Sequence, residues 1–175
     1  MLDQEPKLRG CELIDAWLER TTDLQDRRGT ASQTDLLAVL GIGEGLVIMA
    51  VEAKVDESFG QLVRQWLGAG SDGKAERLKQ LCALFGLDEA TVGELRYQLF
   101  HRTAAAIYEA RRFRSGLAIL MVQSFCPNAT GLEDFVAFFD RVGMTGVGRD
   151  KLSLPKLIGG IELRVGWTSD VCPPA

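Results

Sequence analysis

Predominantly apolar runs mark the segments that we expect to form β-strands. Two of them, 46–55 and 117–125, are rich in Val, Ile, Leu and Met, which is typical of strands covered on both faces. A third run, 35–40, is separated from 46–55 by a glycine-rich link, and this arrangement predicts a β-hairpin. Apolar and polar residues alternate in 161–167, a pattern that favours a half-buried edge strand.

Helical spacing of apolar residues occurs between these strands and before the first of them. The predicted helices cover 12–20, 59–67, 74–85, 91–114 and 132–142, and the segment 143–156 is predicted to be a loop. Helices that alternate with a few strands around one sheet indicate an α/β fold. We therefore expect a single domain over residues 1–175, in which 171–175 forms a frayed tail.

The composition excludes several classes of protein. The chain has 175 residues, of which 46% are hydrophobic and 25% charged, with a net charge of −4, and such values exclude an intrinsically disordered chain. No apolar run approaches the ~18 residues of a membrane-spanning helix. The acidic N-terminus lacks the apolar core of a secretory signal. We expect a cytoplasmic protein without a membrane partner.

The chain offers few ligands for a soft metal ion. Its four cysteines are far apart in the sequence and never have the paired spacing of a zinc site; they are Cys11, Cys82, Cys126 and Cys172. We expect them to be free thiols, because a cytoplasmic chain of this size does not need disulfides. His101 is the only histidine, so a multi-histidine site is excluded and carboxylates must hold any metal ion.

Glu52 and Lys54 are the charged residues at the end of the clearest predicted strand. Residues two apart on a strand point to the same face, so both side chains emerge together. Charges at the edge of a core cost several kcal/mol per ion unless they are paired or bind a ligand. One interpretation is therefore a partly solvated ion-pair network at the strand end.

Asp35 makes a second interpretation possible. If Gly43 and Glu44 form a two-residue turn, paired positions sum to 87 and Asp35 lies opposite Glu52, with Cβ atoms about 4.5–5.5 Å apart. A divalent cation relieves the repulsion between two facing carboxylates, and Mg²⁺ or Mn²⁺ prefers such oxygen ligands. Lys54 could then position a water that attacks a phosphodiester.

Asp35 followed by Glu52-Ala53-Lys54 resembles the D…(D/E)-x-K signature of the PD-(D/E)XK nuclease superfamily. The resemblance implies a restriction-endonuclease-like fold, a mixed β-sheet flanked by helices. It also implies that the two acids bind the metal ion and that the lysine serves the attacking water. An acidic residue of the preceding helix often completes such a site, and the candidates here are Glu12, Asp15 and Glu19. Thr34 stands where the motif has proline.

A wider resemblance, to an uncharacterised bacterial family, covers most of the chain and bears on the fold. The segments that carry it are 33–38, 51–60, 96–105, 116–125 and 165–167.

The predicted helix 91–114 carries a polar stripe that needs partners. Gln98, His101 and Arg102 lie on adjacent turns and could bind substrate, because arginine suits bidentate phosphate binding. The alternative is that Arg102 pairs with an internal acid and His101 is structural. For Glu109, a structural ion pair is the favoured interpretation.

Two functions follow from these residues. The first is a Mg²⁺- or Mn²⁺-dependent phosphodiester hydrolase, a nuclease that acts on DNA or RNA. The second is a nuclease-like domain without catalysis that binds a protein or DNA. The net charge of −4 argues against strong nonspecific binding of nucleic acid, so affinity would need a local basic groove or a protein partner.

Overall fold

The computed structural model describes residues 1–175 except 25–30, 69, 71, 126–127 and 171–175. Its sheet contains β1 (Glu12–Thr22), β2 (Ser32–Ile42), β3 (Gly45–Lys54), β4 (Leu117–Ser124), β5 (Lys151–Leu152), β6 (Lys156–Ile158) and β7 (Ile161–Ser169). The helices are α1 (Val63–Leu67), α2 (Asp72–Phe85), α3 (Tyr97–Arg112) and α4 (Leu132–Val142), with short 3₁₀ turns at Leu2–Gln4 and Glu89–Thr91. The predicted α/β class is therefore confirmed.

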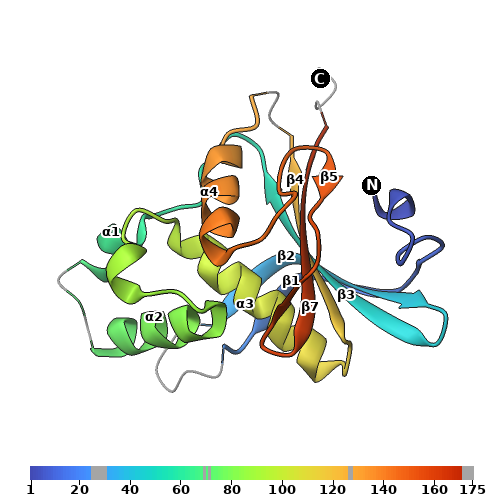
Figure 1. The fold of residues 1–175 in the computed structure, drawn as a ribbon, viewed down its shortest axis with the longest axis horizontal. Coiled ribbons are helices and arrows are strands. Elements are labelled where there is room, and N and C mark those ends of the chain that lie inside the picture. The colour runs from blue at the N-terminus through green and yellow to red at the C-terminus, as the bar shows by residue number, and fades with distance from the viewer. Residues whose placement is uncertain (25–30, 69, 71, 126–127, 171–175) are drawn as a thin grey trace.

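The seven strands form one mixed sheet in the order β1-β2-β3-β4-β7-β5, and β6 also pairs with β7. The first three strands are antiparallel to one another, whereas β3, β4 and β7 run parallel. Parallel neighbours need a crossover, and α1 to α3 supply it between β3 and β4. The helices lie on one side of the sheet and the N-terminal segment lies on the other (Figure 1).

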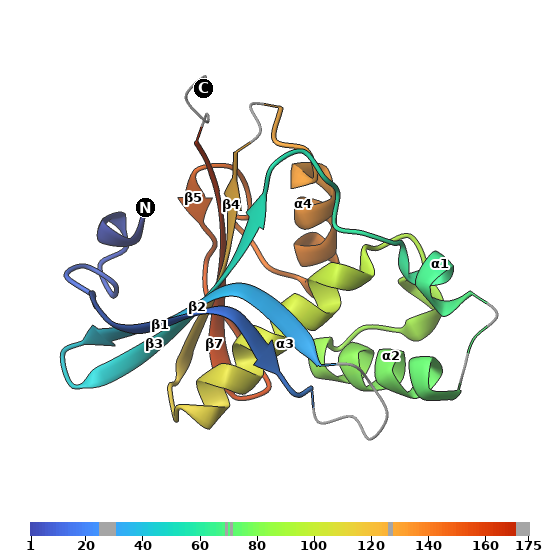
Figure 2. The same cartoon turned by 180° about the vertical axis from the view of Figure 1, so that it is seen from behind.

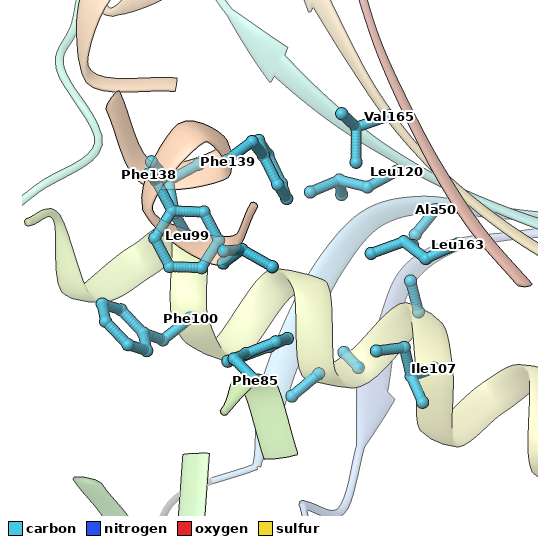
Figure 3. Close-up of a cluster of buried hydrophobic side chains, with 14 of the residues drawn as sticks. Ala50, Phe85, Leu99, Phe100, Ile107, Leu120, Phe138, Phe139, Leu163 and Val165 are labelled. Atoms are coloured by element: carbon cyan, nitrogen blue, oxygen red, sulfur yellow. The ribbon is translucent and has the colours of Figure 1, made fainter. Parts of the chain in front are cut away.

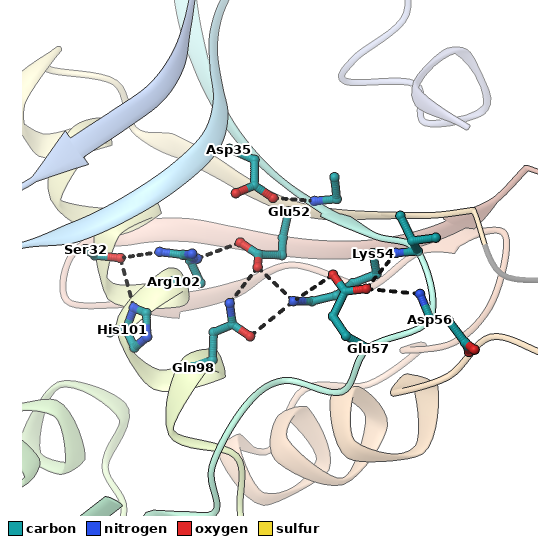
Figure 4. Close-up of polar contacts among 11 residues, drawn as sticks. Ser32, Asp35, Glu52, Lys54, Asp56, Glu57, Gln98, His101 and Arg102 are labelled. Atoms are coloured by element: carbon teal, nitrogen blue, oxygen red, sulfur yellow. Dashed lines mark hydrogen bonds and ion pairs between the residues drawn. The ribbon is translucent and has the colours of Figure 1, made fainter.

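Helix α3 is the element that joins the helical layer to the sheet. Its apolar side packs on the sheet through residues such as Leu99 and Ile107, both fully buried (Figure 3). Phe100, on a neighbouring side of the helix, stacks edge-on with Phe138 of α4, their ring centroids 4.8 Å apart. The first turns of α3 lie beside the carboxyl end of β3 (Figure 4), so residues about 50 positions apart meet there.

The segment 12–20, predicted to be a helix, forms strand β1 instead. The strand lies at the sheet edge (Figure 2) and pairs with β2 from Glu12↔Gly41 to Thr22↔Ser32. Trp17 packs against Phe113, with ring centroids 5.7 Å apart, while Leu18 is 79% exposed. The apolar spacing suits a helix equally well, but pairing with β2 decides in favour of a strand because it satisfies the backbone hydrogen bonds along one side.

Other predicted boundaries needed correction. Helix α1 covers only Val63–Leu67, and α3 starts at Tyr97 because the 3₁₀ turn and a second turn around Gly93 precede it. The predicted loop 143–156 contains β5 and the first residue of β6. Strand β7 is not at the edge: it lies between β4 and β5 and buries Trp167 completely. The predictions for the hairpin, 74–85, 117–125 and 132–142 are confirmed to within three residues at each end.

Within the described ranges, no helix is long and apolar enough to cross a membrane. Cys11 and Cys82 are free thiols, as predicted. Cys126, Cys172 and the predicted frayed tail 171–175 lie outside the described residues.

Candidate functional site

The β2–β3 hairpin has the register that the sequence predicts. Gly43 and Glu44 form the turn, and paired positions sum to 87 from Ile42↔Gly45 to Leu36↔Val51. The pairing ends there, one residue before Asp35. The carboxylate of Asp35 therefore does not meet that of Glu52 as an opposed pair: its Oδ2 accepts a hydrogen bond from the Ala53 backbone N–H at 2.7 Å (Figure 4).

Glu52 is a buried carboxylate, 3% exposed, and cationic and amide donors surround it. Lys54 Nζ lies 3.0 Å from Oε1, and Gln98 Nε2 donates to the same oxygen at 2.6 Å. Arg102 Nε donates to Oε2 at 2.5 Å. A carboxylate removed from water needs such partners to remain ionised, and here two positive charges enclose one negative charge.

Lys54 is equally buried, 4% exposed, and lies between several acceptors. Besides Glu52, its Nζ donates to Gln98 Oε1 at 3.2 Å and lies 3.8 Å from Glu57 Oε1. The ammonium also stands 5.1 Å from the ring centroid of Phe59, a cation–π contact. Gln98 thus bridges Glu52 and Lys54, with one end of its amide on each.

Glu57 is the second acid beside Lys54. Burial alone would raise the pKa of its carboxyl, but hydrogen bonds from backbone N–H groups, including those of Asp56 and Val55, and the charge of Lys54 leave the pKa lower than its usual value. The carboxylate is therefore ionised at neutral pH and adds a negative charge at the rim of the site.

His101 connects the network to the start of β2. Its Nδ1 hydrogen-bonds Ser32 Oγ at 2.9 Å, and Arg102 Nη1 donates to the same oxygen at 3.2 Å. Burial, followed by the charges of Arg102, Arg77 and Lys54, lowers the pKa of His101 to about 3. The imidazole is consequently neutral at physiological pH.

A groove of about 600 Å³ opens beside this network. One wall carries Trp66 stacked on Tyr97, with ring centroids 3.6 Å apart. Its lining residues come from β3, the segment after it, α1 and the start of α3: Lys54, Glu57, Ser58, Gly60, Gln61, Trp66, Tyr97, Gln98, His101 and Arg102. Four of the predicted catalytic and substrate-binding residues therefore line one concave surface: Lys54, Gln98, His101 and Arg102.

The structure thus brings together most of the candidate residues that the sequence singled out. Glu52, Lys54, Gln98 and Arg102 are in direct contact, and His101 joins them through Ser32. Ser32 is a member that sequence reasoning missed, because no pattern marks it. Glu57, three residues after Lys54, also belongs to the site. Glu109 is a structural ion-pair member, as favoured: its Oε2 lies 3.3 Å from Arg20 Nη2.

Glu12, the predicted third metal ligand, lies elsewhere. It pairs with Gly41, six residues along β2 from Asp35, which corresponds to about 20 Å of strand. The reason is that 12–20 is an edge strand rather than a helix packed beside the site. Among the alternatives, Glu19 is level with Asp35, because its neighbours Leu18 and Arg20 pair with Leu36 and Thr34.

The donor chemistry of Asp35 and Glu52 fits a hard divalent cation, because both supply carboxylate oxygens. No group of three or more His, Cys, Asp or Glu side chains placed to hold a metal ion occurs in the described part of the chain. Both oxygens of Glu52 are also engaged by Lys54, Gln98 and Arg102. A cation could bind Glu52 only after at least one of these donors moves away.

A family model described as a domain of unknown function, DUF6946, matches residues 1–172, nearly the whole chain. No curated protein and no solved structure matches the chain.

Proposed function

The chain belongs to the DUF6946 family, and we propose that it is a phosphodiester hydrolase that acts on nucleic acid with Mg²⁺ or Mn²⁺. One observation carries the proposal. Glu52 and Lys54, at the end of β3, are buried, and Gln98 and Arg102 contact them beside a groove of about 600 Å³. Charged groups held at the wall of a groove are typical of catalytic sites rather than of a packed core.

Each residue has a role that its position supports. Asp35 and Glu52 would hold the cation, with Asp35 anchored by the Ala53 N–H. When bound, a divalent cation makes water a better nucleophile at neutral pH and stabilises charge on the phosphoryl oxygens. Lys54 lies beside Glu52 and would orient the attacking water. Arg102, which also lines the groove, would bind a phosphate oxygen pair.

The topology supports the restriction-endonuclease-like interpretation of the fold. An antiparallel hairpin carries Asp35 near the start of β2 and Glu52-Ala53-Lys54 at the end of β3, and β3 then pairs in parallel with β4. This is the arrangement that the resemblance to PD-(D/E)XK nucleases implies. A nucleic-acid substrate of the cytoplasm, DNA or RNA, belongs to the same proposal.

A second function, that of a nuclease-like module without catalysis that binds a protein or DNA, is favoured by a different observation. The ion pairs of Glu52 with Lys54 and Arg102 are closed and buried, as in a structural network. If that network never opens, the site holds no cation, and the groove serves recognition only.

Hydrolysis of end-labelled oligonucleotides separates the two functions. We would incubate single- and double-stranded DNA and RNA with the protein and Mg²⁺ or Mn²⁺, with EDTA as the blank. The wild type should cleave at least one substrate, and Asp35→Asn and Lys54→Met should each lower the rate by about 10²–10³-fold. The controls Asp140→Asn and Lys79→Met, at exposed helix positions, should cleave normally. Cleavage that Asp35→Asn leaves intact would refute the assigned roles.

A further inference from the structure

The groups that hold Glu52 are those that a phosphodiester needs. Arg102 offers a planar set of N–H donors that matches two oxygens of a phosphate as well as those of a carboxylate. Lys54 supplies a compact positive charge. Both side chains line the groove, yet both point toward Glu52 (Figure 4). Arg102 Nε lies 2.5 Å from Glu52 Oε2, and Lys54 Nζ lies 3.0 Å from Glu52 Oε1. Glu52 therefore takes the place of an anion in this arrangement.

The same contacts engage the oxygens that a divalent cation needs. Oε1 of Glu52 forms an ion pair with Lys54 and accepts a hydrogen bond from Gln98, and Oε2 accepts a hydrogen bond from Arg102. A cation that approaches this carboxylate also meets two positive charges in a partly dehydrated site, where repulsion is strong. Metal binding and the closed network therefore exclude each other at Glu52.

Arg102 has a second anchor that allows it to change partners. Its Nη1 donates to Ser32 Oγ while its Nε donates to Glu52, and its side chain remains 12% exposed toward solvent. Loss of the Glu52 contact would leave the guanidinium held at Ser32. Gln98 likewise forms hydrogen bonds with both Glu52 and Lys54 and can retain either hydrogen bond when the other is lost.

We infer that Glu52 is an internal substitute for the substrate phosphate, so that a nucleic-acid strand and a divalent cation bind this site cooperatively. A backbone phosphate takes Arg102 and Lys54 from Glu52, and the released carboxylate then accepts the cation. This inference rests on the proposed function and adds to it a binding order, with the strand first. Coupling between two sites is reciprocal, so each ligand must raise the affinity for the other by the same factor.

Two variants test the coupling from opposite sides without any turnover. Arg102→Gln removes the guanidinium that blocks Glu52 while Lys54 still pairs with it, so Mn²⁺ alone should bind about tenfold more tightly than to wild type. Glu52→Gln frees both cations, so a thymidylate 12-mer in EDTA should bind about tenfold more tightly. Both values lie within the usual range of coupling factors, about 5–150-fold. Arg141→Gln, at an exposed position of α4, controls for the loss of one positive charge.

Free Mn²⁺ is measured by electron paramagnetic resonance with and without the 12-mer, corrected for Mn²⁺ bound by the oligonucleotide itself. Binding of the labelled 12-mer is measured by fluorescence anisotropy. In the wild type the 12-mer should raise the Mn²⁺ affinity, and in Arg102→Gln, where only Lys54 remains to be taken from Glu52, it should raise that affinity by a smaller factor. Circular dichroism melting confirms that each variant is folded, and if Glu52→Gln does not fold, the Mn²⁺ titrations alone decide.

The inference is overturned if Arg102→Gln binds Mn²⁺ no more tightly than Arg141→Gln, or if the 12-mer leaves the Mn²⁺ affinity of the wild type unchanged. If the wild type still cleaves oligonucleotides in that case, the proposed function stands and only the coupling is wrong. If the wild type neither binds Mn²⁺ with the 12-mer present nor cleaves any substrate, the proposed function and the inference both fail.

Discussion

His101 should make the stability of the fold depend on pH between pH 7 and pH 5. It is the only histidine of the chain, so any histidine titration belongs to it. Its pKa is about 3 in the folded protein, chiefly because of burial, and the charges of Arg102, Arg77 and Lys54 act in the same direction. The reference value for an unfolded chain is about 6.5.

The direction in which stability changes with pH depends on which state, folded or unfolded, binds the proton. Between pH 6.5 and pH 3 the unfolded chain takes up a proton on His101 that the folded protein excludes, so acid favours unfolding. The stability that the neutral ring contributes is complete above pH 6.5 and is lost as the pH falls toward 3. One pKa unit corresponds to about 1.4 kcal/mol, so the loss between pH 7 and pH 5 is at most about 2 kcal/mol.

The perturbation is His101→Asn, which keeps a polar atom near Ser32 but does not titrate in this range. Urea unfolding of both proteins at pH 7 and pH 5 gives the free energy of unfolding at each pH. The wild type should lose about 2 kcal/mol more than the variant on going to pH 5. Equal losses in the two proteins, or a ring-proton NMR titration of the folded protein near pH 6.5, would refute the reasoning.

Two further predictions concern the buried groups outside the groove. In urea titrations, Glu109→Ala should lower the free energy of unfolding by about 2–4 kcal/mol, because it leaves Arg20, 21% exposed, without its buried partner. The control Arg112→Ala, at a side chain 63% exposed, should change the free energy of unfolding by less than about 0.5 kcal/mol. Iodoacetamide at pH 8 should modify Cys11 at least about tenfold faster than Cys82, as measured by peptide mapping. The reason is that burial, and then nearby acidic groups, raise the pKa of the Cys82 thiol to about 11. Equal labelling rates at the two thiols would contradict the prediction.

The sequence predicts the hairpin well because the information there is local. A two-residue turn at Gly43 and Glu44 sets the register, and the alternation of side chains then places Glu52 and Lys54 on one face. The same rule fails at Asp35, which it places directly opposite Glu52. The β2–β3 pairing ends at Leu36↔Val51, and the Asp35 carboxylate accepts a hydrogen bond from the Ala53 N–H instead.

The rest of the site depends on contacts between distant segments. Strand β1 is specified by pairing with β2 and not by its own periodicity, which is why Glu12 was misplaced. Arg102 and Gln98 meet Glu52 because α3 lies beside β3 after a long crossover. From the sequence alone, Arg102 could either contact a phosphate or pair with an internal acid. Only the three-dimensional structure shows that it pairs with Glu52.

The central claim, that Asp35 and Glu52 hold a divalent cation beside the groove, is tested most directly by Mn²⁺ binding in the presence of the thymidylate 12-mer. Wild type and Asp35→Asn would be titrated side by side by electron paramagnetic resonance, with Asp140→Asn as the matched control. Our account predicts one saturable site in the wild type and in Asp140→Asn, with affinity lowered at least about tenfold in Asp35→Asn. Equal binding by all three proteins, or no binding at millimolar Mn²⁺, would contradict it.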